Sequence, residues 1–481
     1  MPPRRRSARP LAALPLFLAA LLGGCGDGEL QPARRVILIT CDTLRADRMG
    51  VYGCPQPTTP ALDAFAREAI VFDRAYSTAP LTLPSVCSML TGRLPAAIGV
   101  EHNRQFLPSE VQTIAERLSG AGIATAAVVS NWVLVNPPGM PPEFGVRQGF
   151  AHYDATMTSR EAVRGMPERV APATTAAAIR WLERALDAGE DRFFLWVHYQ
   201  DPHGPYVAPE SFVREVDRPL GDEAPVPFAP GEEGKGGIPV YQRLGDERHP
   251  EYYRIRYDAE IRYLDAAVGR LLDFLRARGL LADALVVFSA DHGESLGEHD
   301  YWFCHGESLS GELLRVPLLV RYPAGMPHPR AREAEGHRRV DEVVNQLDLF
   351  PTVLAAFGLA PGSGPGTSLL ARSLPAGRVA VQMLGLDDGS PRRRAVNDGR
   401  WRLHLGEGQA PRLYDLAADP GEERDLAAEH PDVVAAMKER YAAFLARDAG
   451  ESLPGQTRAL SAEEERILRG LGYAGKGGGG D

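Results

Sequence analysis

Short apolar runs alternate with helical patterns along most of the chain. Five runs have the length and composition of buried strands: Val36 to Thr40, Ala124 to Val129, Phe193 to Val197, Ala284 to Phe288 and Val316 to Val320. Between them lie segments with the apolar spacing of amphipathic helices: Pro60 to Ile70, Val111 to Ser119, Thr174 to Leu186 and Tyr257 to Arg278. This alternation predicts an α/β fold, with a mainly parallel central sheet between helices.

Stretches rich in Pro and Gly suggest how the chain is divided. Residues 207–250 lack sustained periodicity and are expected to form a surface insertion. A Pro/Gly/Ser cluster at 361–368 follows a helix predicted over 347–359 and is typical of a linker. Beyond it, the hairpin signal Asn397-Asp398-Gly399 lies between two predicted strands, 378–383 and 401–405, and a helix is predicted over 431–445. We therefore expect a catalytic domain over 35–360, a linker over 361–374, a small α+β domain over 375–450 and a tail over 451–481.

Composition and charge narrow the class of protein. The 481 residues are 44% hydrophobic and 24% charged, which is typical of a folded globular chain and not of a disordered or polytopic membrane protein. The 53 basic and 63 acidic residues give a net charge of −10, and no dense Lys/Arg stripe occurs within the predicted fold. This pattern excludes a nucleic-acid platform, and we expect no nucleic-acid partner.

The N-terminus has the pattern of an export signal. Four arginines within residues 4–9 precede an apolar run, Leu11 to Leu22, that is too short to span a bilayer. The sequence Leu22-Gly23-Gly24-Cys25 resembles the lipobox of bacterial lipoproteins. We therefore expect a signal peptide over 1–24, lipidation of Cys25, a linker over 25–34, and attachment to a membrane in the bacterial periplasm or at the cell surface. An ordinary cleaved signal with an incidental Cys25 is the alternative.

Polar residues follow three of the predicted strands directly. Asp42 comes after the first strand, His198 to His203 after the third, and Asp291-His292 after the fourth. Ligands of open α/β sheets bind beyond the carboxyl ends of the strands, and carboxylates with imidazoles suit a divalent metal. An Asp after a strand is more often a cap or turn residue, so each segment alone is a weak signal. Together they predict a metal site.

A fourth segment carries a candidate nucleophile. Pro84 suits the first turn of a helix, which places Thr82 at or just before the N-cap. A hydroxyl there can be a plain cap. It would also lie where the helix dipole and free N–H groups favour a phosphate or sulfate, and next to a metal it could act as an alkoxide nucleophile.

These segments together resemble the sulfatase family of the alkaline phosphatase superfamily, from Arg35 to about Tyr473. Six stretches match the family's order: CDTLRADRMGVYG, LTLPSVCSMLTGR, FFLWVHYQDPHGPY, SADHGESLGEH, HGESLSGELLRVPLLVRYP and RLYDLAADPGEERDLA. The resemblance implies an alkaline phosphatase-like α/β fold, a metal-dependent hydrolase of anionic esters, and a covalent intermediate on the nucleophile.

The chain departs from the family at two positions. Sulfatases carry Cys-x-Pro-x-Arg, whose Cys becomes formylglycine, but here Thr82 stands at the Cys position and Val86 at the Arg position. Cys87 lacks the Pro two residues on that the motif requires, and we interpret it as a core residue. Thr43 replaces the second Asp of the family's Asp-Asp pair. This is therefore a variant without formylglycine and with one carboxylate ligand fewer.

The resemblance assigns roles residue by residue. Asp42, Thr82, Asp291 and His292 match the metal positions, and Thr82 is also the nucleophile. His203 and His305 match positions that contact the substrate or protonate the leaving group. His198, His299 and Glu294 are interpreted as supporting or structural residues. We expect one divalent ion, with manganese or zinc favoured by the imidazole ligand and calcium as the alternative.

The expected substrates are small-molecule, lipid or glycan anionic esters. Phosphodiesters and phosphonate esters come first because a phosphothreonine is easier to hydrolyse than a threonine sulfate, whereas formylglycine can expel sulfate by re-forming its aldehyde. Sulfate esters are the second choice. Two alternatives stay open: an envelope transferase of phosphoethanolamine or phosphoglycerol head groups, and a non-catalytic binding protein with a sulfatase fold. The sequence carries no signal for the oligomeric state.

Overall fold

A computed structural model of the protein describes residues 32–136, 144–385, 390–448, 452–457 and 460–471. The predicted signal peptide and Cys25 lie outside the described residues. No helix within these ranges is long and apolar enough to cross a membrane. The cysteines described are free thiols at Cys41, Cys54, Cys87 and Cys304.

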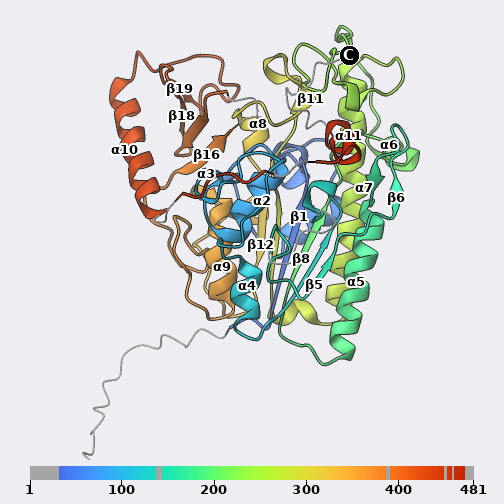
Figure 1. Cartoon of the computed structure of the whole chain (residues 1–481), viewed down its shortest axis with the longest axis vertical. Coiled ribbons are helices and arrows are strands. Elements are labelled where there is room, and N and C mark those ends of the chain that lie inside the picture. The colour runs from blue at the N-terminus through green and yellow to red at the C-terminus, as the bar shows by residue number, and fades with distance from the viewer. Residues whose placement is uncertain (1–31, 137–143, 386–389, 449–451, 458–459, 472–481) are drawn as a thin grey trace, which may run out of the picture.

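A nine-stranded mixed sheet forms the centre of the molecule (Figure 1). Its order is β13-β14-β2-β12-β9-β1-β8-β4-β5, and the five strands from β9 to β5 are parallel. The strands are β1 (Arg35–Cys41), β2 (Ile70–Phe72), β4 (Ala124–Val129), β5 (His152–Asp154), β8 (Phe193–Tyr199), β9 (Ala284–Ala290), β12 (Leu318–Arg321), β13 (Arg332–Ala334) and β14 (His337–Val340). The mainly parallel α/β fold is confirmed, and β12 is antiparallel to both of its neighbours.

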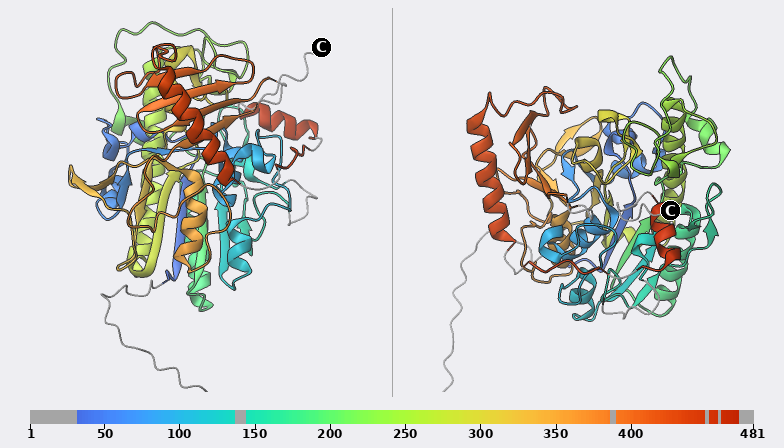
Figure 2. Two further views of the ribbon diagram at one scale, coloured as in Figure 1. Left: turned by 90° about the vertical axis from the view of Figure 1, so that its left-hand side faces the viewer. Right: turned by 45° about the horizontal axis from the view of Figure 1, so that its top comes forward.

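The central strands are apolar because helices cover both faces of the sheet. All seven residues of β1, β8 and β9 are buried. Helices α1, α5 and α7 lie against one face and α2, α4 and α9 against the other (Figures 1 and 2). Their bounds are α1 (Pro60–Ala66), α2 (Thr82–Thr91), α4 (Ile114–Ser119), α5 (Ala171–Asp187), α7 (Pro250–Ala277) and α9 (Leu349–Ala356).

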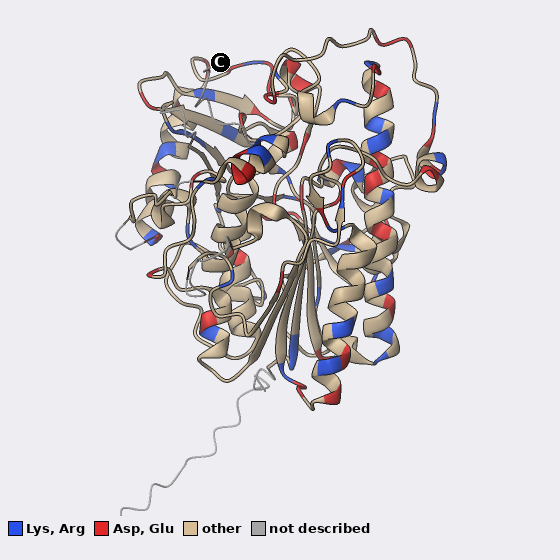
Figure 3. Cartoon of the chain, turned by 45° about the vertical axis from the view of Figure 1, so that its right-hand side comes forward, with Lys and Arg blue, Asp and Glu red and all other residues tan. Residues whose placement is uncertain are grey.

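Helix α7 begins seven residues earlier than its apolar stripe predicts. Pro250 is its first residue, and the ring of His249 accepts a hydrogen bond from the Glu251 amide. The first turns mix Glu251, Arg254 and Arg256 with the buried Tyr253 and Ile255, so the apolar stripe is interrupted there although the segment is helical. Charges of both signs are interspersed along α5 and α7 (Figure 3). The predicted insertion 207–250 contains a helix of its own, α6 (Glu210–Val216).

A second, antiparallel sheet packs beside the first. It consists of β16 (Ala380–Leu384), β17 (Arg393–Asn397), β18 (Trp401–Gly406) and β19 (Arg412–Asp415), and α10 (Pro431–Arg447) covers it. The chain then returns to the catalytic domain, and the last described helix is α11 (Ala462–Gly470), which lies within the predicted tail. Short elements complete the fold: β3 (Ala75–Tyr76), α3 (Pro95–Ile98), β6 (Ser159–Arg160), β7 (Pro167–Glu168), β10 (Ser295–Leu296), β11 (Trp302–Cys304), α8 (Gly311–Leu314) and β15 (Val344–Asn345).

Candidate active site

The strand register brings two carboxylates together. Strand β1 lies between β8 and β9, and Cys41 pairs with Ala290 at the carboxyl ends of β1 and β9. The next residues, Asp42 and Asp291, are therefore neighbours, and the Asp291 amide donates to the Cys41 carbonyl at 3.1 Å. This is the edge of the sheet at which ligands of α/β folds bind.

Asp42, Asp291 and His292 form the one cluster of metal-ligand type among the described residues, with ligand atoms within 4.8 Å of one another. Nε2 of His292 lies 3.6 Å from Oδ1 of Asp42 and 3.6 Å from Oδ2 of Asp291. All three side chains are fully buried, and neither of these two oxygens has a hydrogen-bond partner. Buried, unpartnered carboxylate oxygens are costly unless a cation neutralises them, so the cluster fits a divalent ion.

The other atoms of the cluster are held in place by neighbouring groups. Nδ2 of Asn131 donates to Oδ2 of Asp42. Oδ1 of Asp291 accepts from the amides of Thr43, at 3.2 Å, and His292, at 2.7 Å. Nδ1 of His292 lies 2.9 Å from the Gly293 carbonyl, which assigns the proton to Nδ1 and leaves the Nε2 lone pair facing the carboxylates.

Burial and the adjacent Asp291 raise the pKa of Asp42 well above its usual range, and the Asn131 hydrogen bond acts in the opposite direction. Asn131 was not identified as a site residue from the sequence. Its signal is its position shortly after β4, which makes it another polar residue at the same edge of the sheet.

Thr82 is the first residue of α2, and Leu81 occupies the N-cap position without a side-chain cap. The prediction that placed Thr82 at or before the cap is thus shifted by one position. Oγ1 of Thr82 lies 3.4 Å from Nε2 of His292, and the residue is fully buried. Helix α2 is anchored behind the cluster because Ser85 donates to the Asp291 carbonyl at 2.6 Å.

The two predicted histidines lie beside this cluster. The ring of His305 is 4.6 Å from that of His292 and 5.1 Å from that of His203, measured between centroids. Burial lowers the pKa of both His203 and His305 well below the usual range. The structure therefore brings all six predicted site residues to one edge of the sheet: Asp42, Thr82, His203, Asp291, His292 and His305.

Glu294 connects to this group through His305. Its Oε1 lies 3.0 Å from Nδ1 of His305, and its Oε2 accepts from the Tyr206 hydroxyl at 3.1 Å. The carboxyl is fully buried, which raises its pKa to about 8. Glu294 was interpreted from the sequence as a supporting residue, and in the structure it contacts His305 rather than the metal-ligand cluster.

Thr43 directly follows the candidate ligand Asp42 and has an unusual backbone conformation. Its φ of 56° is in the left-handed region, which is strained for a β-branched residue and is typical of functional sites. The Tyr257 hydroxyl donates to its carbonyl at 2.6 Å. The side-chain oxygen is buried without a hydrogen-bond partner, next to a cluster that has three strong ligands rather than four.

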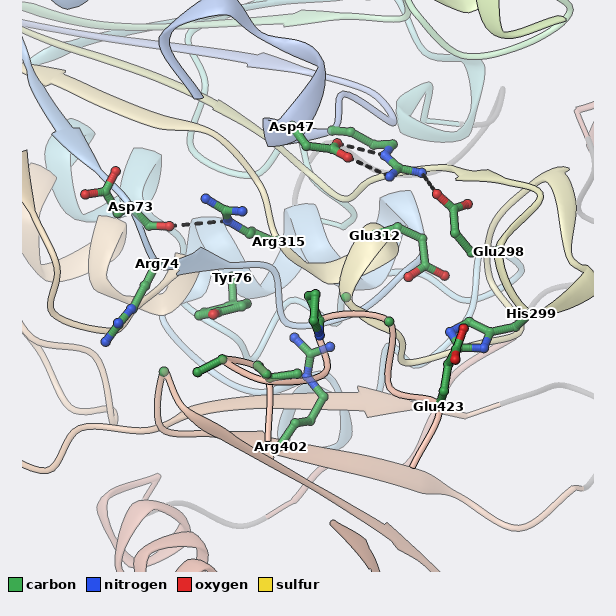
Figure 4. Close-up of a pocket in the computed structure, with 17 residues that line it drawn as sticks. Asp47, Asp73, Arg74, Tyr76, Glu298, His299, Glu312, Arg315, Arg402 and Glu423 are labelled. Atoms are coloured by element: carbon green, nitrogen blue, oxygen red, sulfur yellow. Dashed lines mark hydrogen bonds and ion pairs between the residues drawn. The ribbon is translucent and has the colours of Figure 1, made fainter. Parts of the chain in front are cut away.

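Two large cavities lie near the candidate active site. The first, about 640 Å³, lies between the catalytic domain and the second sheet, and charged side chains such as Arg315, Arg402, Glu312 and Glu423 line it (Figure 4). It contains neither Thr82 nor any of the clustered ligands. The second, about 580 Å³, is lined by residues that include Leu83 and Trp132.

Comparison with known proteins independently supports the resemblance to sulfatases. Residues 34–359 match the family model described as Sulfatase. The chain is 29% identical over 369 residues to an ulvan-active sulfatase from Formosa agariphila, covering 72% of this chain and 66% of that enzyme. It is 27% identical over 476 residues to human arylsulfatase A, covering 84% and 86% respectively. Its fold is similar to that of the phosphonate monoester hydrolase of Agrobacterium radiobacter, with a TM-score of 0.68, 22% identity, and coverage of 89% and 100%.

Proposed function

The chain belongs to the sulfatase family of ester-bond hydrolases, and from that premise we propose that it is a metal-dependent hydrolase that forms a covalent intermediate on Thr82. The observation that carries the proposal is the 3.4 Å separation between Oγ1 of Thr82 and Nε2 of His292, beside two unpartnered carboxylate oxygens. A hydroxyl in that position is a nucleophile when it is deprotonated.

Asp42, Asp291 and His292 would hold one divalent ion, with Thr82 completing the set. The His–carboxylate donor set favours manganese or zinc over calcium. Such an ion, when bound, lowers the pKa of a neighbouring hydroxyl and withdraws charge from the ester oxygens. Asn131, the Gly293 carbonyl and the amides of Thr43 and His292 fix the ligand atoms.

The chemical steps follow from the side chains. Thr82 gives its hydroxyl proton to solvent water, and Oγ1 attacks the central atom of the ester in line with the leaving oxygen. The bond to the leaving oxygen breaks, and that oxygen takes a proton from His203 or His305, whose protonated form the anionic ester favours. Water then attacks the threonine ester and gives a proton to the same histidine, the bond to Oγ1 breaks, and Thr82 regains a proton from solvent. Phosphodiesters and phosphonate esters are the preferred substrates because a phosphothreonine hydrolyses more readily than a threonine sulfate, and sulfate esters are the second candidate.

Hydrolysis of four p-nitrophenyl esters tests this proposal. A soluble form that starts after Cys25 is assayed with manganese or zinc on a sulfate, a phosphate monoester, a phosphodiester and a phosphonate monoester, with Thr82→Ala as control. We expect diester or phosphonate turnover that falls at least about 10³-fold in the variant. Substantial residual activity in Thr82→Ala would contradict a threonine nucleophile, and sulfate turnover lost in the variant would contradict the preference for phosphorus.

We also propose that the protein is exported and held at a membrane by lipid on Cys25. The support is the arginine-rich start, the short apolar run and the lipobox-like sequence. In a bacterial host, the full chain is expected in the membrane fraction and the Cys25→Ala variant in the soluble periplasmic fraction. Equal membrane association of both forms would contradict the lipid anchor.

A further inference from the structure

The 580 Å³ cavity adjoins the candidate active site through two separate segments. Leu83, on its wall, directly follows Thr82, and the Leu83 amide donates to Oδ1 of Asn103 at 2.9 Å. Trp132, on another wall, directly follows Asn131, the residue that donates to Asp42. The cavity therefore borders the two segments that carry Thr82 and Asn131, although neither of these residues lines it.

The walls of this cavity differ from those of the larger cavity in Figure 4. Apolar side chains contribute much of the surface: Leu83, Phe106, Trp132, Val133, Leu460 and Leu468. The larger cavity is instead lined mainly by arginines and carboxylates, many of them already paired with one another. Ligand pockets for organic groups are mostly apolar with a few polar residues, and the volume suits an aryl or medium alkyl group.

The outer wall comes from α11, beyond the residues that match the family model. Leu468 is 2% exposed and packs in one cluster with Leu81, the residue before Thr82. Nη1 of Arg104 pairs with Oε2 of Glu465 at 3.0 Å, and Arg164 donates to the Gly470 carbonyl, so both ends of the helix are tied down. The shape of the cavity is therefore a property of this chain rather than of the family region alone.

We infer that this cavity binds an apolar organic group of the substrate. The inference rests on the proposed function and specifies it: the substrates are amphiphilic anionic esters with an aryl or alkyl group, and not esters of sugars. The cavity also has polar residues, among them Gln105, Asn136 and Glu464, but a sugar ring would place some of its hydroxyls against the apolar side chains, where they lose hydrogen bonds to water. An alkyl or aryl group gives up no hydrogen bonds when it enters the cavity, and its transfer out of water is favourable.

Binding of organophosphonates tests the inference without requiring turnover. Their carbon–phosphorus bond is not the ester bond that the proposed reaction cleaves. The manganese-loaded protein is titrated calorimetrically with methyl-, butyl-, hexyl- and phenylphosphonate, and with glucose 6-phosphate as the polar comparison. We expect affinity to rise about two- to fourfold per added methylene group. Phenylphosphonate is expected to bind more tightly than glucose 6-phosphate.

Variants show whether the dependence of affinity on chain length comes from this cavity. Trp132→Ala and Leu468→Ala, both in the lining of the cavity, should each flatten the dependence on chain length, whereas Trp401→Ala, on β18 against His430, should preserve it. Affinity independent of chain length, or tighter binding of glucose 6-phosphate, would overturn the inference. Length-dependent binding without hydrolysis of any ester would support the cavity and contradict the proposed function, so the two failures are distinguishable.

Discussion

Oγ1 of Thr82 and Nε2 of His292 face each other at 3.4 Å across the end of the central sheet, although 210 residues separate them in the chain. The contact depends on two elements, the first turn of α2 and the loop after β9, and Ser85 holds them together through the Asp291 carbonyl. The proposed nucleophile is therefore positioned by the same loop that supplies two candidate metal ligands.

Removal of metal is expected to destabilise the protein as well as to abolish hydrolysis. Oδ1 of Asp42 and Oδ2 of Asp291 are buried without hydrogen-bond partners, so an ion that neutralises them binds the folded state selectively. At an ion concentration of about 100 times Kd, such binding contributes about 2.7 kcal/mol. Thermal unfolding should show a lower Tm after treatment with a chelator and recovery with manganese or zinc. An unchanged Tm together with no bound ion by elemental analysis would contradict a metal site here.

Asn131→Ala should weaken metal binding about 10- to 100-fold, because Oδ2 of Asp42 loses its hydrogen-bond donor. The matched control is Asn136→Ala in the same loop, since the Asn136 side chain donates to the Phe144 carbonyl and does not contact the cluster. Titration of the metal-free protein with manganese measures the difference directly. Equal affinities in the two variants would show that Asn131 does not position Asp42.

Much of this arrangement was predictable from the sequence, because it depends on local patterns. The apolar runs of β1, β8 and β9 marked buried parallel strands, and the polar residues that follow them had to meet at one edge. The resemblance to sulfatases then located Thr82 near Asp42 and Asp291. The positions of helix ends were less predictable, as at α7, whose first turns mix charged residues with buried apolar ones.

Contacts between distant segments could not be predicted. Asn131 lies 89 residues from Asp42, and its position shortly after β4 indicates the edge of the sheet but not that its side chain donates to Asp42. Helix α11 has few apolar residues and follows a Gly- and Pro-containing stretch, so its sequence resembles a solvated tail. Its place beside Leu81 depends on ion pairing with Arg104 and on packing of Leu468, which only the folded chain reveals.

Glu294→Gln should shift the pH dependence of hydrolysis. Burial raises the pKa of the Glu294 carboxyl to about 8, so the carboxyl is mostly neutral below that pH and ionised above it. An ionised carboxylate 3.0 Å from Nδ1 of His305 stabilises the protonated imidazole that would donate to the leaving group. The variant lacks that charge, so its kcat should match that of the wild type below about pH 7 and fall more steeply than that of the wild type above about pH 8. The pH profile of kcat measures this shift.

His299→Ala provides the control for that experiment. His299 lies on the same loop but is exposed and lines the cavity of Figure 4, away from the cluster. Its pH profile should match that of the wild type. A profile of Glu294→Gln that is lowered uniformly at all pH values would indicate a structural role for Glu294 rather than an effect on His305.

Glu422 is expected to be the residue on which the junction between the two domains most depends. Its carboxylate pairs with Arg402, which is 1% exposed, lies 2.9 Å from Nε2 of His404, and accepts from the Gly311 amide at 2.8 Å. Glu422→Ala would leave the Arg402 charge buried without its partner, which typically costs about 3–5 kcal/mol. Urea unfolding should show this loss. The neighbouring Glu423→Ala, at an exposed position, should change stability by less than about 0.5 kcal/mol.

The contribution of Glu422 to the free energy of unfolding should also depend on pH in a defined direction. Burial opposes ionisation of this carboxyl, but Arg402 and His404 outweigh it and lower the pKa to about 2, from an ordinary value of 4.5. A carboxyl with a lowered pKa contributes stability that is complete above its unfolded pKa and is lost as the pH falls toward its folded pKa. The difference in unfolding free energy between wild type and Glu422→Ala should therefore be constant above about pH 5.5 and shrink between about pH 4.5 and 2. A difference that stays constant down to pH 2 would mean that the ion pair with Arg402 does not form in solution.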